Sequence, residues 1–392
     1  MKKFFKFIIM LLVCTILVGM LSGCNVINSN GNVNQSLNGD VKVDKSKKYA
    51  YIPNKDEKTC TIIDYDHSTE TTLDIPTELD GYKVTAIDSQ AFGVCRNLTS
   101  ITIPEGVTSI GDRAFACCDS LKSVIIPNSV VQIGVGLFQE CHNLISINIP
   151  DGVTKINDNT FWRCASLTNI TLSDNVTEIG SFAFSECTSL TEMIIPDSVT
   201  EIGLSAFQEC TSLSKINIPN GITNINDQTF YGCIRLTNII LPDSVIEIGS
   251  SAFNECIRLC EVNIPEGVTS IEDGTFQRCR SLKSITIPNS VTKIGESAFR
   301  ECTFTSITIP EGVISIGNDA FRDCSKLETI ILPKSLTSIG ESAFQYSFDF
   351  NYLFFNVKYG GSEKDWEKIN IGRFNNFDIA TDTGRMYYNY NN

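Results

Sequence analysis

Histidine and tryptophan are scarce in this chain, which has two of each among its 392 residues. Nothing in the sequence places His67 or His142 in a Ser-His-Asp or Cys-His arrangement. A zinc site needs four converging ligands, and the cysteines that would have to supply most of them are spread along the chain. We therefore predict no catalytic residues, no metal site and no cofactor, and we do not expect an enzyme.

Positive charge is also in short supply, because 31 Lys and Arg residues stand against 45 Asp and Glu residues, for a formal net charge of −14. A protein that binds nucleic acid needs a basic surface to neutralise the phosphates. The acidic balance argues against nucleic acid as a partner and against electrostatic docking on anionic lipid. It is compatible with solubility outside a cell and with cationic partners.

Phenylalanine, by contrast, recurs with a fixed period. The step is 23 residues, with one step of 22 residues, through Phe92, Phe115, Phe138, Phe161, Phe184, Phe207, Phe230, Phe253, Phe276, Phe299, Phe321 and Phe344. A period of this length is typical of a stacked solenoid, in which each unit contacts its neighbours and presents the same surface positions in rows. The chain is therefore expected to form one elongated body with a cap at each end.

One repeat, from Leu98 to Cys118, shows how a unit is built. Ile101 and Ile103 alternate with polar residues, which predicts a short strand with one buried face, and the proline after them ends it. Two further apolar residues bring the chain back across the core. The spacing of Ala114, Phe115 and Cys118 predicts a short helical turn facing inward, or an irregular segment in its place. Each repeat would then form one coil.

These residues resemble the leucine-rich repeat of the BspA-like, Treponema pallidum type, over roughly residues 75 to 344. The unit differs from the general leucine-rich pattern by its proline after the strand and by Ala-Phe-x-x-Cys where other classes place an Asn ladder. The resemblance implies a leucine-rich repeat arc with a parallel β-sheet on its concave side and capping units at both ends. It also implies a bacterial surface protein associated with adhesion.

The first residues of the chain predict export. Lys2, Lys3 and Lys6 accompany an apolar run that ends near Met20, and small residues precede Cys24. This pattern indicates a lipoprotein signal peptide over residues 1–23, whose removal leaves Cys24 to carry the lipid anchor on the outer side of a bacterial cell membrane. An uncleaved transmembrane helix is the alternative.

Composition divides the rest of the chain. Residues 24–49 are rich in Asn, Ser, Gly and Lys and predict a flexible tether. Residues 50–94 predict an N-terminal cap with a first atypical repeat, residues 95–345 the regular repeats and residues 346–392 a C-terminal cap. We interpret Trp366 as part of the packing of that last cap.

Cysteine also occupies one position of the repeat. Of 16 cysteines, this column holds Cys95, Cys118, Cys141, Cys164, Cys187, Cys210, Cys233, Cys256, Cys279, Cys302 and Cys324. Disulfides are common in exported proteins, and neighbouring rungs lie within disulfide range, but eleven members cannot all pair within the column. We interpret the column as small, buried, reduced packing residues.

Candidate binding residues come from two sets of variable positions. The exposed slot of the predicted strand holds mainly Thr, Asn and Ile, and from it we take Thr171, Asn217 and Asn263. The position after the repeated Phe is usually small or polar, but it holds Trp162, followed by Arg163, and Tyr231. Aromatic residues and Arg are enriched in binding hot spots. The alternatives are that the polar residues keep the sheet soluble and that the aromatics cover neighbouring coils.

These observations predict a lipid-anchored leucine-rich repeat protein on the cell surface that binds an extracellular protein or glycan and has no chemistry of its own. It would touch a membrane only through its anchor. The alternative is a structural envelope protein that spaces or organises its neighbours, which predicts self-association.

Overall fold

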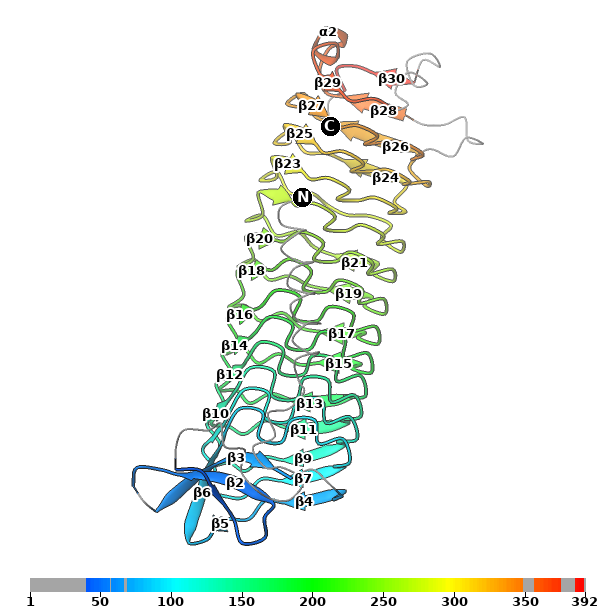
Figure 1. The fold of residues 1–392 in the computed structure, drawn as a ribbon. Coiled ribbons are helices and arrows are strands. Elements are labelled where there is room, and N and C mark those ends of the chain that lie inside the picture. Colours follow the sequence, from blue (N-terminus) through cyan, green and yellow to red (C-terminus); the bar gives the residue numbers. More distant parts are fainter. Residues whose placement is uncertain (1–39, 57, 67–68, 348–355, 375–384, 391–392) are drawn as a thin grey trace.

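The computed structural model describes residues 40–56, 58–66, 69–347, 356–374 and 385–390, so the predicted signal peptide and Cys24 lie outside the described residues, as does His67. Figure 1 shows an elongated stack of coils in which successive repeats lie one above the next. The predicted repeat solenoid is confirmed. Two ladders of short strands run along two sides of the stack.

The first, which we call ladder A, contains the strand that the Leu-x-x-Ile-x-Ile pattern predicts. Its strands pair in parallel with a register of one repeat, for example Ser146 with Asn169. They are β4 (Thr72–Asp74), β7 (Ser100–Thr102), β9 (Ser123–Ile125), β11 (Ser146–Asn148), β13 (Asn169–Thr171), β15 (Glu192–Met193), β17 (Lys215–Ile216), β19 (Asn238–Ile239), β21 (Glu261–Val262), β24 (Ser306–Thr308), β26 (Thr329–Leu332), β28 (Asn356–Tyr359) and β30 (Met386–Tyr387).

Ladder B lies on the other side of the coil, where the sequence predicted only a return across the core. There the second residue of each two-residue strand, such as Ile110 or Ile133, points into the core. The strands are β6 (Tyr82–Ile87), β8 (Ser109–Ile110), β10 (Gln132–Ile133), β12 (Lys155–Ile156), β14 (Glu178–Ile179), β16 (Glu201–Ile202), β18 (Asn224–Ile225), β20 (Glu247–Ile248), β22 (Ser270–Ile271), β23 (Lys293–Ile294), β25 (Ser315–Ile316), β27 (Ser338–Ile339) and β29 (Asn370–Ile371).

The Ala-Phe-x-x-Cys segment closes each coil, and the helical turn predicted for it is wrong. In one repeat, Arg113 and Cys117 have φ of 53° and 57°, which no right-handed helix allows. The amides of Arg113, Phe115 and Cys117 donate to carbonyls of the next coil at 2.8–3.1 Å, while the amide of Ala116 donates back to Arg113. The segment is therefore a run of turns that hydrogen-bonds from coil to coil, and the irregular alternative holds.

The core is a column of stacked rings flanked by aliphatic side chains. Consecutive phenylalanines from Phe92 to Phe344 are fully buried, with ring centroids 5.1–5.8 Å apart and ring planes within 19° of parallel. Offset stacking at this spacing is a favourable aromatic geometry. Because every coil presents the same ring, the stack can continue through all the repeats.

The cysteine column lies beside the rings and is buried. From Cys118 to Cys324, each thiol donates to the carbonyl of the Phe in the preceding coil at 3.0–3.2 Å. Burial raises the pKa of the Cys210 thiol to about 12. The protonated thiol is a poor nucleophile. The packing role of the column is confirmed, and its redox state stays a prediction.

At the N-terminal end, strands close the stack. β1 (Lys42–Val43), β2 (Tyr49–Pro53) and β3 (Thr59–Tyr65) form an antiparallel meander, and β3 continues in parallel into β6 and ladder B. The short β5 (Glu78–Leu79) pairs with β6. The ring of Tyr65 stacks 5.3 Å from that of Phe92, so tyrosine extends the aromatic column into this cap.

The C-terminal end carries the one α-helix of the described residues, α2 (Glu363–Trp366), which begins with a capping box between Ser362 and Asp365. Trp366 is buried and meets Tyr359 edge to face at 5.3 Å, which confirms its interpretation as cap packing. Within the described ranges, no helix has the length and apolar character needed to cross a membrane.

Candidate binding surface

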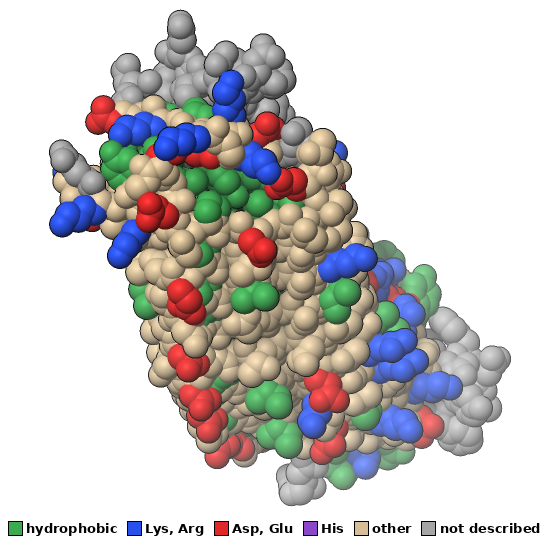
Figure 2. All heavy atoms as spheres, turned by 90° about the horizontal axis from the view of Figure 1, so that it is seen from below, with side chains coloured by type: hydrophobic (Ala, Val, Ile, Leu, Met, Phe, Trp, Pro, Cys, Tyr) green, Lys and Arg blue, Asp and Glu red, His purple; other side chains and the backbone are tan. Residues whose placement is uncertain are grey.

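The outward face of ladder A carries an uncommon row of exposed aliphatic side chains. Ile125, Ile194 and Ile240 occupy the same slot of their coils and are 60%, 76% and 72% exposed. Most other coils place Asn or Thr in that slot, and Ile331 in the same slot is only partly exposed. Figure 2 shows one face of the molecule, with hydrophobic side chains both singly and in one larger group near an end, and acidic side chains along one edge. Ladder A itself combines these exposed isoleucines with a few exposed charged residues, such as Glu192 and Lys215.

The asparagines predicted to bind a partner form hydrogen bonds between coils, and their binding role stays a prediction. The side chain of Asn217 accepts from the amide of Ile195 at 2.8 Å and donates to the carbonyl of the same residue at 2.7 Å. Asn263 forms the same pair of bonds with Leu241, at 2.7 Å each. These amides take the place of backbone pairing between coils. Thr171 in the same slot is exposed at the end of β13.

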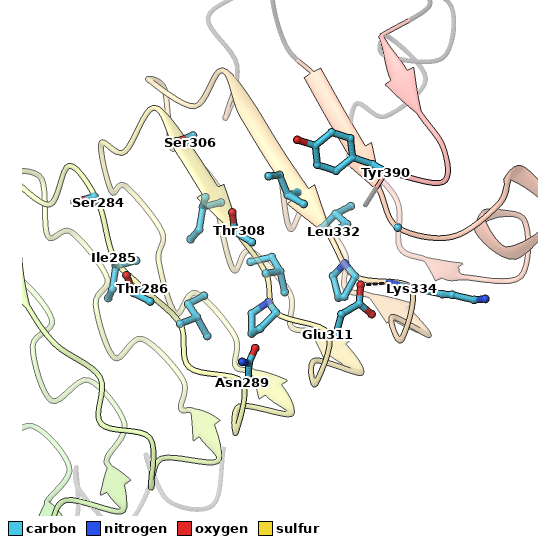
Figure 3. Close-up of a pocket in the computed structure, with 17 residues that line it drawn as sticks. Ser284, Ile285, Thr286, Asn289, Ser306, Thr308, Glu311, Leu332, Lys334 and Tyr390 are labelled. Carbon is cyan, nitrogen blue, oxygen red and sulfur yellow. Dashed lines mark hydrogen bonds between the residues drawn. The ribbon is translucent and has the colours of Figure 1, made fainter. Parts of the chain in front are cut away.

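Near the C-terminal end, ladder A opens into a cleft of about 820 Å³. Figure 3 shows hydroxyl side chains from two neighbouring coils along it, and Tyr390 of the C-terminal cap over one end. The side chain of Glu311 accepts from the backbone amide of Lys334 at 3.4 Å, which orients its carboxylate at the rim. The residues that line the cleft include Ser284, Ile285, Thr286, Ser306, Thr308 and Tyr390.

Ladder A is interrupted at the cleft, as it also is between β13 and β15 and between β17 and β19. In the part of the chain that the structure describes, no backbone hydrogen bond joins residues 284–287 to the coil on either side. Ile285 is only partly buried, whereas its counterparts Val262 and Ile307 in the neighbouring coils are buried. The interruption leaves backbone amides and carbonyls of an extended segment open to a ligand.

The one 22-residue step of the repeat lies on the downstream side of this cleft segment. Between Cys302 and the next strand the chain is one residue short, and Phe304 stands where the other repeats have Leu. Phe304 is fully buried and meets Phe299 and Phe321 edge to face at 5.9 and 6.3 Å. The larger ring and the shorter segment thus lie between residues 284–287 and β24.

Of the irregular residues predicted as hot spots, none lies on ladder A. Trp162 is 8% exposed, and the guanidinium carbon of Arg163 lies 4.4 Å from the centre of its ring. Arg163 is held by Glu140 and Glu186. Tyr231 is half-buried, and burial raises its pKa, with Glu255 and Glu209 adding to the rise. The structure therefore brings these three residues to the turn face, away from Thr171.

The described residues were also compared with the requirements of a metal site. No group of three His, Cys, Asp or Glu side chains in those ranges is placed to hold a metal ion. His142 is exposed, with Nδ1 2.9 Å from Oδ1 of Asp119 in the preceding coil. This contact is a surface pair.

The repeat region was also compared with models of known protein families. The family described as BspA type leucine-rich repeat region, in six copies, matches residues 71–191, 177–303 and 247–362. The chain belongs to this family. A leucine-rich repeat solenoid is typically a scaffold for interactions rather than an enzyme.

Among solved structures, the BspA-type chain is similar to a leucine rich cell surface protein from Faecalibacterium prausnitzii, with 31% identity, coverage of 86% of this chain and 99% of that chain, and a TM-score of 0.52. The T. pallidum leucine-rich repeat protein is 29% identical over 56% of this chain and 91% of that chain, with a TM-score of 0.39. The pneumococcal vaccine antigen PcpA is 18% identical over 90% and 98%, with a TM-score of 0.59, and shows the fold alone. A comparison with curated proteins found no match.

Sequence reasoning missed the cleft, although its signal is visible. The 22-residue step and Phe304 lie in the coil that follows residues 284–287 at the cleft. The exposed isoleucines could be read from the slot pattern, but the backbone role of Asn217 and Asn263 required coordinates.

Proposed function

We propose that this BspA-type protein is exported, is anchored to the cell membrane by lipid on Cys24, and binds an extracellular partner through ladder A without catalysing a reaction. The observation that supports the proposal is the row of exposed isoleucines that shares ladder A with an open cleft of about 820 Å³. Similarity to a leucine rich cell surface protein supports the location.

The character of this face favours a protein over a glycan. Exposed isoleucines beside an open cleft give a protein partner apolar surface to bury, and apolar burial is a major source of protein–protein affinity. The backbone groups left open at residues 284–287 suit an extended peptide segment, which would supply the missing hydrogen bonds. A glycan is then an outcome that the binding test distinguishes.

The test measures binding of the full chain, purified in a non-ionic detergent, to epithelial cells, immobilised matrix proteins and immobilised glycans. We expect saturable binding to a protein target, and loss of that binding in the triple variant Thr171→Glu, Ile194→Glu, Ile240→Glu. This set leaves Asn217 and Asn263 intact, because replacing them would disturb the sheet.

A matched control carries the same charge change on other exposed positions. Val131, Ile246 and Ile314 are 57%, 57% and 50% exposed and belong to the ladder B side of their coils. The variant Val131→Glu, Ile246→Glu, Ile314→Glu should bind as the parent does. Binding to glycans alone would reject a protein partner, and absence of binding together with concentration-dependent self-association would favour the structural alternative.

The anchor is tested separately. Cells that express the chain and grow with labelled palmitate should incorporate label into it, and Cys24→Ala should abolish that labelling. A parent chain that stays unlabelled and keeps residues 1–23 would instead support an uncleaved transmembrane helix.

A further inference from the structure

A second surface, on the turn face, is formed by the residue that precedes each cysteine of the column. We call this row the outer column. Its backbone is left-handed in every repeat, with φ between 56° and 70° from Glu140 to Asp323, so each member projects from an equivalent turn. In that span its members are Glu140, Arg163, Glu186, Glu209, Gly232, Glu255, Arg278, Glu301 and Asp323.

Twice in this column an arginine sits between two glutamates from the adjacent coils. Arg163 Nε lies 3.1 Å from Glu186 and its Nη1 lies 3.5 Å from Glu140. Arg278 repeats the arrangement, with Nε 3.1 Å from Glu301 and Nη1 2.5 Å from Glu255. In both cases the guanidinium uses two different nitrogens to bridge glutamates on either side. We call each arrangement a Glu-Arg-Glu triad.

An aromatic ring supports the first of these triads. Trp162 directly precedes Arg163, is buried, and its ring centre lies 4.4 Å from the guanidinium carbon. A guanidinium over an aromatic face is attracted by the negative face of the ring. The first triad is therefore a complete arginine site built from two carboxylates and one ring.

Between the two triads the same pattern recurs with the arginine missing. Glu209 and Glu255 lie on either side of Gly232, and Tyr231 directly precedes Gly232 as Trp162 precedes Arg163. A Cβ added at Gly232 would meet the carboxyl carbon of Glu209 at 2.7 Å and both of its oxygens at 2.9 Å. The carboxylate of Glu209 thus lies over the glycine. We call this place the Gly232 notch.

The notch has no positive charge of its own. Within the described residues the carboxylate of Glu209 has neither an ion pair nor a side-chain hydrogen bond. Burial raises its pKa, and the Glu255 and Glu186 carboxylates add to the rise. In Glu301, at the same position of its own coil, burial also acts to raise the pKa, but hydrogen bonds from Arg280 and Arg278 bring it below the usual value.

Two buried amide oxygens flank the same place. In the row that contains Tyr231, the preceding member is Gln208 and the following member is Asn254. Gln208 Oε1 and Asn254 Oδ1 are both buried and have no hydrogen-bond partner among the described residues. Buried acceptors without a donor are uncommon in folded proteins. The coils before and after Tyr231 therefore each offer an unused hydrogen-bond acceptor, and a guanidinium, which has several N–H donors, could donate to such acceptors.

We propose that the Gly232 notch binds the guanidinium of an arginine side chain presented by a partner protein, between Glu209 and Glu255 and against Tyr231. The two filled triads of this chain show the geometry that such an arginine would adopt. Lysine donates all its hydrogen bonds from one nitrogen, so it lacks the planar fork with which Arg163 and Arg278 reach the two glutamates from different nitrogens. A calcium ion takes six to eight oxygen ligands, more than two carboxylates provide. The inference concerns the turn face and stands whether or not ladder A binds a partner.

The first measurement uses three blocked pentapeptides, Gly-Ser-X-Ser-Gly, in which X is arginine, citrulline or lysine. Each is titrated into the full chain in non-ionic detergent and followed by ligand-observed NMR. Citrulline keeps the shape of arginine without its charge. We expect saturable binding of the arginine peptide, and binding weaker by about tenfold or more for the other two. Equal binding of the citrulline peptide would reject a charge-based site, and equal binding of the lysine peptide would reject the guanidinium assignment.

The variants locate the binding. Gly232→Arg should complete a third triad from within the chain and abolish peptide binding, and Glu209→Gln should weaken it by about tenfold. Glu140→Gln removes the same charge from the same column three coils away, and should change affinity by less than about twofold. Unchanged binding in Gly232→Arg overturns the proposal, provided that its thermal unfolding matches that of the parent. If that variant does not fold, unchanged binding in Glu209→Gln overturns it.

Discussion

Buried and outward positions of the coil differ in how much the residue changes from one repeat to the next. The ring column has Phe in twelve successive repeats, each stacked on the next. The outer column, two residues further along the chain, changes between Glu, Arg, Gly and Asp from Glu140 to Asp323. A buried ring meets the same ring above and below, so a different residue would leave a cavity or a clash in both neighbours. An outward residue meets water on one side and can change. Differences between repeats on the outside are therefore the informative ones for function.

The largest effect that the comparison predicts is in the ring column. Phe207 is fully buried and stacks 5.4 Å from Phe184 and 5.7 Å from Phe230. Phe207→Ala should lower the free energy of unfolding by about 3–5 kcal/mol. Urea unfolding followed by circular dichroism measures it, with the exposed Thr171→Ala as control, which should change stability by less than about 0.5 kcal/mol. Equal effects of the two variants would contradict the distinction between inside and outside.

The next effect concerns the short coil. A serine inserted after Thr303 together with Phe304→Leu restores the sequence Cys-Thr-Ser-Leu that the chain has at Cys210. We expect ladder A to close, which would add about 1 kcal/mol for each backbone hydrogen bond restored. Hydrogen exchange with mass spectrometry should show slower exchange at residues 284–287. Phe304→Leu alone keeps the short coil and serves as the control. Unaltered exchange in the insertion variant would show that coil length does not cause the cleft.

The cysteine column is expected to tolerate a polar replacement better than an apolar one. In the last coil Ser347 occupies the column position, is fully buried, and donates to the carbonyl of Phe321 as the thiols do in their coils. Cys210→Ser keeps a small donor and should cost about 1 kcal/mol. Cys210→Val adds volume beside the rings and should cost about 1–3 kcal/mol. Thermal unfolding of the two variants decides the order, and a less stable serine variant would show that the donor has no value there.

The smallest predicted effect is a gain in stability when Glu209, on the outside of the coil, is replaced by glutamine. Because the pKa of Glu209 is raised by burial and by neighbouring carboxylates, the folded chain holds this proton more tightly than the unfolded chain, whose carboxyl has the ordinary value of 4.5. Ionisation of Glu209 therefore costs stability as the pH rises above 4.5. Glu209→Gln should raise the unfolding temperature slightly at pH 7 and leave it unchanged below pH 4.5. Glu301→Gln, whose pKa is lowered, should reduce it at pH 7.

Particular residues show how far sequence reasoning reached. The Phe and Cys columns, the ladder A strands and the cap role of Trp366 were predicted and are confirmed, because each depends on a local pattern of burial. The conformation of the Ala-Phe-x-x-Cys segment was predicted wrongly. Its spacing fits one helical turn, but hydrogen bonds to the next coil favour left-handed turns, and a single repeat cannot reveal that competition.

The candidate sites needed more than pattern. Trp162, Arg163 and Tyr231 stood out by residue type, but their use became clear only when neighbouring coils supplied Glu140 and Glu186 to the first triad and Glu209 and Glu255 to the notch. Each of these glutamates lies one repeat away in sequence from Arg163 or Gly232, the residue between them. Only the stacking register makes them neighbours.

The sequence by itself determined the coil, its period and its buried face, because a 23-residue unit with fixed apolar positions can bury them only by stacking on copies of itself. It also determined that the surface would be acidic and poor in histidine. The tertiary structure alone decided which outward side chains meet, which backbone groups stay open at residues 284–287, and which carboxylate lacks a partner. Those outcomes depend on contacts between coils, and such contacts depend on the exact register of each coil against the next.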